Sequence, residues 1–103
     1  MATVHVTLSR VDDRGDTGGS LPVVTSVPEL AQTLISSSAS QASTIAAPKA
    51  DGLVWTVVPT GNVFVKFGAA PVANSGEGHL VLAGQARDFS VTSLGEKIAV
   101  KDA

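Results

Sequence analysis

The sequence predicts an all-β fold: a compact antiparallel β-sandwich or jelly-roll-like domain with an extended N-terminal arm and loop. From residue 53 to residue 100, short β-rich runs follow one another, and glycine or proline interrupts them. The five expected strands of this half are Leu53–Val58, Val63–Phe67, His79–Leu82, Ala86–Val91 and Lys97–Lys101. With 103 residues, the chain has room for one domain with one core.

Residues 1–28 are expected to add a strand, a mobile loop and a proline-containing arm to a sandwich formed by residues 29–103. Thr3–Ser9 alternates apolar and polar side chains, which indicates a half-buried strand. Arg10–Ser20 is rich in aspartate and glycine and has the composition of a loop. Leu21–Pro28 is apolar but contains two prolines, so it is expected to be an extended arm or an edge strand.

The segment that follows the arm is ambiguous between helix and strand. Ser26 and Glu29 have the spacing of a capping box, and apolar residues recur at helical intervals up to Ile35. The serines that follow Ile35 are poor helix formers, and the same residues also alternate as a strand would. The local pattern slightly favours a helix, followed by a serine-rich loop and a short strand at Ser43–Ala46.

The later strands predict where the core and the edges lie. Trp55 is the expected large core anchor. In Val63–Phe67, apolar residues occupy both faces, and Phe64 points away from the others, so both faces need cover. In Lys97–Lys101, Ile98 and Val100 are expected to point inward, and the charged ends suit an edge strand.

The composition favours association with other protein. Only 16% of the residues are charged and 44% are hydrophobic, against about 25% charged in typical globular domains. Such a small, charge-poor domain exposes neutral and apolar surface, and the absence of cysteine excludes stabilisation by disulfides. The net charge is −2 and no basic stripe is present, so nucleic-acid binding has little electrostatic basis. No apolar run is long enough to span a bilayer.

No group of polar residues assembles into a reactive site. The tripeptide at residues 14–16, Arg-Gly-Asp, is interpreted as a turn, and Asp12, Asp13 and Asp16 do not have the spacing of an EF-hand. His5 and His79 are the two histidines, and no cysteine completes a zinc site with them. We therefore predict no enzyme activity, no cofactor and no metal.

Residues 34–103 resemble a protein family. The segments that carry the resemblance are the serine-rich link at 34–43, Asn62–Gly68, Ala69–Ala73, Leu80–Gly84, Phe89–Val91 and Gly95–Val100. Their order is similar to the small β-sandwich virion proteins of tailed bacteriophages and prophages, such as head-decoration (cement) and head or tail accessory proteins. The resemblance favours a strand at Glu29–Ser36, against the local helical pattern.

What the resemblance implies is a non-enzymatic structural protein on the virion surface, synthesised in the host cytoplasm. Its expected role is a head-decoration protein that stabilises the capsid through protein–protein contacts. The alternative is a fibre accessory module that binds a receptor or a carbohydrate. The expected partners are the chain itself, as a trimer or other homo-oligomer, and major capsid or other virion proteins. The segments Met1–Ser9 and Leu21–Pro28 are expected to reach a neighbour. The expected interface residues are Val4, Val6, Leu21, Val23, Val24, Phe64 and Val72.

Overall fold

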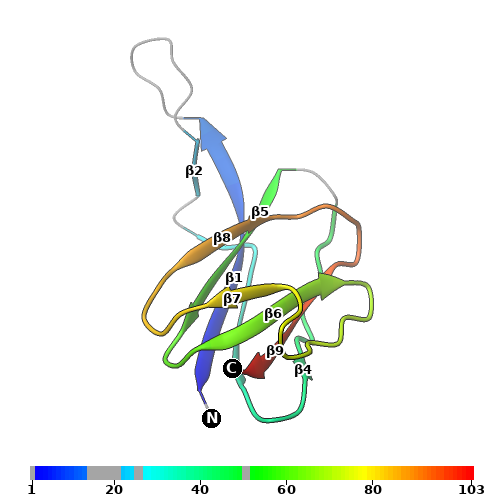
Figure 1. The fold of residues 1–103 in the computed structure, drawn as a ribbon. Helices are drawn as coiled ribbons and strands as arrows, with labels where there is room; N and C mark the ends of the chain where they lie inside the picture. Colours follow the sequence, from blue (N-terminus) through cyan, green and yellow to red (C-terminus); the bar gives the residue numbers. More distant parts are fainter. Residues whose placement is uncertain (1, 14–21, 25–26, 50–51) are drawn as a thin grey trace.

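The chain forms two antiparallel β-sheets packed face to face, which confirms the predicted sandwich (Figure 1). A computed structural model describes residues 2–13, 22–24, 27–49 and 52–103. The strands within these ranges are β1 (Thr3–Asp13), β2 (Pro22–Val24), β3 (Leu30–Ile35), β4 (Gln41–Ala42), β5 (Leu53–Pro59), β6 (Val63–Gly68), β7 (His79–Val81), β8 (Arg87–Ser90) and β9 (Lys97–Asp102). All the observed pairings are antiparallel.

The first sheet is built around β1. Its strand order is β2-β1-β5-β8, and β3 also pairs with β1. β3 pairs with the first part of β1, from Thr3 to Leu8, and β2 pairs with its last part, from Val11 to Asp13. The end of β1 and its partner β2 project beyond the rest of the sandwich (Figure 1). The second sheet has the order β4-β9-β6-β7.

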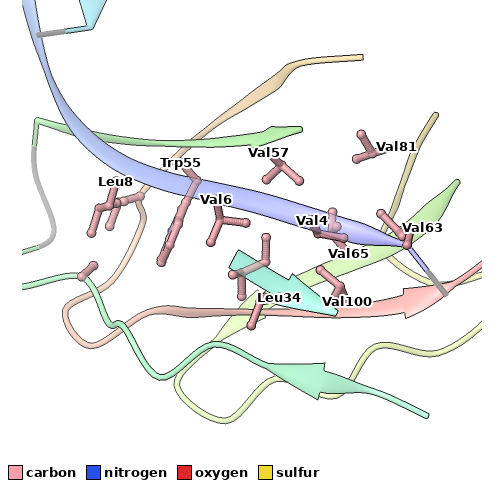
Figure 2. Close-up of a cluster of buried hydrophobic side chains, with 14 of the residues drawn as sticks. Val4, Val6, Leu8, Leu34, Trp55, Val57, Val63, Val65, Val81 and Val100 are labelled. Carbon is pink, nitrogen blue, oxygen red and sulfur yellow. The ribbon is translucent and has the colours of Figure 1, made fainter. Parts of the chain in front are cut away.

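The core lies between the two sheets, where alternate residues of each strand point inward. Val4, Val6 and Leu8 of β1 are fully buried, as their alternation in the sequence predicts. Trp55 of β5 is also fully buried, which confirms it as the core anchor. Figure 2 shows these side chains packed among others of the core. The core residues that the second sheet contributes are Val63, Val65, Val81, Ile98 and Val100.

The helix favoured by the local pattern at residues 29–36 is wrong, because this segment is the strand β3. All six of its residues pair in an unbroken register with β1, from Leu30 opposite Leu8 to Ile35 opposite Thr3. Leu34 is buried in the core and Leu30 packs against it, whereas Ile35 is exposed. Backbone pairing with β1 and burial of one face therefore outweigh the capping box and the helical spacing.

Two segment boundaries also differ from the prediction. Residues 10–13 continue β1 and are not part of a loop. The predicted strand at Ser43–Ala46 is wrong, since the paired residues are Gln41 and Ala42 of β4. At the next residue, the Ser43 amide donates to the Ile98 carbonyl at 2.7 Å, while the Ser43 hydroxyl accepts a hydrogen bond from the Ile98 amide at 3.1 Å.

Two expectations about exposed strands are corrected as well. β1 pairs with other strands on both of its sides, so the segment Met1–Ser9, which was expected to reach a neighbour, is from Thr3 onward a central strand and is not free to pair with one. β9 lies between β4 and β6 and is not an edge strand. Ala99 of β9 points away from the core, yet it is fully buried and lies outside the main hydrophobic cluster.

Candidate protein-contact surfaces

Along residues 3–9 of β1, the outward face of the first sheet is almost free of charge. Because the inward positions of β1 are Val4, Val6 and Leu8, the alternating residues and their cross-strand partners point outward. We call this surface the neutral face, and its residues are Thr3, His5, Thr7, Ala31, Thr33, Ile35, Val54, Thr56, Val58, Asp88 and Ser90. Asp88 carries its one formal charge and accepts a hydrogen bond from the Thr56 hydroxyl at 2.8 Å.

Most of the neutral face consists of small or β-branched side chains. Ile35 is 53% exposed and Val58 is 39% exposed, although both are apolar. His5 lies among them and its Nδ1 is 3.0 Å from the hydroxyl of Thr33. The free-energy cost of desolvating such a surface is small when another protein covers it, because it bears almost no charged group.

The outward face of the second sheet has a different character. Its described residues are Ala42, Phe64, Lys66, Leu80, Lys97, Ala99 and Lys101. Lys66 forms an ion pair with Glu77 at 3.5 Å. An amide–carboxylate hydrogen bond from Asn74, and then the charge of Lys66, lower the pKa of Glu77. Lysine is depleted in protein interfaces, so this lysine-bearing face is the less favourable contact surface of the two.

The interface residues expected from the sequence differ in their exposure. Val4 and Val6 point inward and are fully buried, so they stabilise the chain's own core and are not available to a partner. Phe64 is half-buried on the lysine-bearing face, and its cross-strand neighbour Leu80 is 44% exposed. Val72 is 57% exposed in the segment after β6.

The other expected interface positions fall in or near the N-terminal hairpin. Val23 and Val24 belong to β2, whose backbone pairs with Asp12 and Val11. Leu21 and the Arg-Gly-Asp tripeptide at 14–16 lie outside the described residues. The contacts of Leu21, Val23 and Val24 with a partner therefore stay predictions.

A buried carboxylate joins the two sheets inside the sandwich. Glu96 is 2% exposed, and its Oε1 accepts a hydrogen bond from the indole N–H of Trp55 at 2.9 Å. Its Oε2 accepts hydrogen bonds from the hydroxyl of Thr92 at 2.8 Å and from the Thr92 amide at 3.2 Å. Both carboxylate oxygens have partners, which indicates a structural role. No local pattern identifies this group, because its Trp55 partner lies 41 residues away in the sequence.

A row of aromatic rings runs from the core to the surface. Trp55, Phe67, Phe89 and His79 follow one another, with ring centroids 6.0, 5.0 and 4.9 Å apart. The guanidinium of Arg87 lies 5.5 Å from the Phe89 ring centroid, a cation–π distance. Phe89 is half-buried, while His79 and Arg87 are exposed. The row therefore ends at the surface between β7 and β8.

The two chain ends meet at a small polar cluster. Ser36 is fully buried; its hydroxyl accepts a hydrogen bond from the Ala2 amide at 2.9 Å and donates one to the Asp102 carboxylate. This donation is the main cause that lowers the pKa of Asp102. A shallow pocket of about 240 Å³ lies beside this cluster, and its described lining is Ala2, Gly61, Asn62, Asp102 and Ala103.

Searches for similar proteins and chemical features add little to this geometry. No family model, curated protein or solved structure matches the chain. In the part of the chain that the structure describes, no three His, Asp or Glu side chains lie close enough to hold a metal ion. Within the same residues, no helix is long and apolar enough to cross a membrane.

Proposed function

We propose that this chain is a non-enzymatic structural protein of a tailed-phage virion, acting as a head-decoration (cement) protein. In this role it binds major capsid subunits through protein–protein contacts and stabilises the shell. The neutral face carries the proposal, because it is a broad exposed surface with one formal charge on a chain whose other sheet bears three lysines.

The contact we expect is between the neutral face and an uncharged surface of the shell. Threonine, valine and isoleucine side chains on a sheet are conformationally stiff, so they lose little rotamer entropy when they are covered. A single small face gives modest affinity, but many copies on a repeating lattice bind with avidity when they also contact one another. The resemblance of residues 34–103 to small virion proteins supports the same assignment.

The experiment is to purify the phage particles produced by a host that carries the gene and to quantify this chain by mass spectrometry. The proposal predicts a fixed ratio of the chain to the major capsid protein, and immunogold labelling spread over the head. Particles that lack the chain, produced by cells that express it, would contradict the proposal. Unrelated host proteins in the same preparation set the background level.

The second candidate is a fibre accessory module that binds a receptor or a carbohydrate. The aromatic row favours it, since Phe89 and His79 present ring surface beside the guanidinium of Arg87. Aromatic rings bind the apolar faces of sugars, and an exposed guanidinium binds a carboxylate. Immunogold labelling confined to tail fibres, together with loss of glycan binding in Arg87→Ala, would favour this function over capsid decoration.

A further inference from the structure

The exposed side of β3 is the one unprotected sheet edge among the described strands. β3 pairs with β1 on one side, and no described strand pairs with its other side. Sheet edges in soluble proteins are usually kept from pairing by short length, charge, proline or bulges. β3 has six residues in an unbroken register, and none of them is charged or proline.

The other edges each carry such protection. β4 has two residues, and β7 has three. β2 has three residues and starts with Pro22, which has no amide hydrogen to donate. β8 has four residues, two of which are Arg87 and Asp88. The contrast singles out β3 as an edge that is able to accept another strand.

The backbone groups that face this open side belong to alternate residues of β3. The amide of Ser36 donates to the Ala2 carbonyl at 2.8 Å, so the even-numbered residues of this segment face β1. Ala31, Thr33 and Ile35 therefore direct their amides and carbonyls away from β1, and all three residues are exposed. Their side chains belong to the neutral face, so an incoming strand would meet no charge from them.

We propose that β3 is a self-association edge, which pairs antiparallel with β3 of a second copy of this chain about a two-fold axis at Thr33. This register places Thr33 opposite Thr33 of the second copy and Ile35 opposite its Ala31. Polar side chains therefore face polar ones, and apolar side chains face apolar ones. It forms about six new backbone hydrogen bonds. A register centred on Gln32 is less favourable, because it places Glu29 opposite the exposed Ile35.

A second copy suits this edge better than a charged partner does. The carboxylate next to the edge, Glu29, is already paired with Arg10 at 3.0 Å, so no unpaired charge of β3 or Glu29 directs a foreign strand. Pairing would join the two first sheets and extend the neutral face over both copies. The inference goes beyond the proposed function and does not depend on it, since the dimer is expected in solution without any phage particle.

The test is the solution mass of the purified chain by light scattering over a dilution series. We expect a dimer of about twice 10.4 kDa at high concentration, which dissociates on dilution. Thr33→Lys places two like charges opposite each other at the axis, and it is expected to give a monomer at every concentration. Ser90→Lys, on the exposed edge strand β8, is the matched control and is expected to remain a dimer.

A cross-linking experiment tests the register and does not depend on the lysine variant folding. The chain has no cysteine, so Thr33→Cys introduces a single thiol, and a short bismaleimide is expected to link two copies in high yield. Ser90→Cys is expected to give little linked product. A monomeric wild-type chain throughout the dilution series, a dimer that survives Thr33→Lys, or equal cross-linking at positions 33 and 90 would overturn the proposal. None of these experiments measures binding to phage particles, so the failure of one proposal is distinguishable from the failure of the other.

Discussion

At the scale of single residues, Glu96 shows how a charge-poor core accommodates an ionisable side chain. Its two carboxylate oxygens accept three hydrogen bonds from Trp55 and Thr92, in a position that is 2% exposed. A carboxylate that replaces all its water partners with protein donors is stable in the interior, and its removal leaves those donors unsatisfied. Glu96 thereby fixes the orientation of the largest core side chain.

We expect Glu96→Ala to lower the free energy of unfolding by about 1–3 kcal/mol, because it leaves the buried indole N–H without an acceptor. Glu96→Gln should cost less, since its amide oxygen can still accept the Trp55 hydrogen bond. Urea unfolding followed by tryptophan fluorescence measures both variants. Glu77→Gln, at an exposed acid, is the control, and an equal effect at positions 77 and 96 would contradict the structural role of Glu96.

The Ser36–Asp102 hydrogen bond predicts a specific acid sensitivity. Because this bond lowers the pKa of Asp102 in the folded chain, its contribution to stability is present above the ordinary value of 3.8 and is lost as the pH falls through the lower folded value. The stability difference between the wild type and Asp102→Asn should therefore be constant near neutral pH and shrink below about pH 3.8. Urea unfolding at a series of pH values measures it, and a difference that does not change with pH would count against the assignment.

At the scale of elements, the sequence could predict most strands and failed where pairing decides the structure. The strands around Trp55, Val65 and Ile98 are short β-rich runs bounded by turn residues, so their positions followed from the sequence. The pattern in β3 fits a helix as well as a strand, and its pairing with β1, 22 or more positions away, settles it. Long-range pairing of this kind has no local signal.

The candidate surfaces were even less accessible to prediction than the strands. The alternation around Val4 and Val6 predicts one buried face, but the sequence cannot show whether that face packs within the chain or against a partner. Only the register of β1 with β3 and β5 shows that they point inward and that the polar residues between them form the neutral face. The aromatic row likewise joins four strands that lie apart in the sequence.

The turn that leads into β7 gives a prediction for a matched pair of glycines. Gly76 and Gly78 both have positive φ, of 79° and 72°. A side chain at Gly78 would collide with the Val65 carbonyl oxygen, whereas nothing lies within 4 Å of one at Gly76. We expect Gly76→Ala to cost about 1 kcal/mol and Gly78→Ala about 3 kcal/mol or more in urea unfolding. Equal costs of the two substitutions would contradict the close approach of Gly78 to the Val65 carbonyl oxygen.

At the scale of the whole molecule, the two outer faces of the sandwich differ in what they can contact. The neutral face presents exposed threonine, valine and isoleucine with a single formal charge, and its edge strand β3 is unprotected. The other sheet presents three lysines and closes with short edge strands. A subunit with this asymmetry is suited to contact a larger protein assembly through its neutral face and to expose its lysine-bearing face to solvent.

Co-sedimentation of the purified chain with phage particles that lack it tests directly whether the neutral face binds the shell. The variant Val58→Lys places a charge on the neutral face at a position that is already 39% exposed, so the fold should persist. The control is Leu94→Lys, at a 69% exposed position between β8 and β9. We expect the wild type and Leu94→Lys to sediment with the particles and Val58→Lys to bind at least about tenfold more weakly. Equal binding by all three chains, or binding by none of them, would rule out attachment through the neutral face.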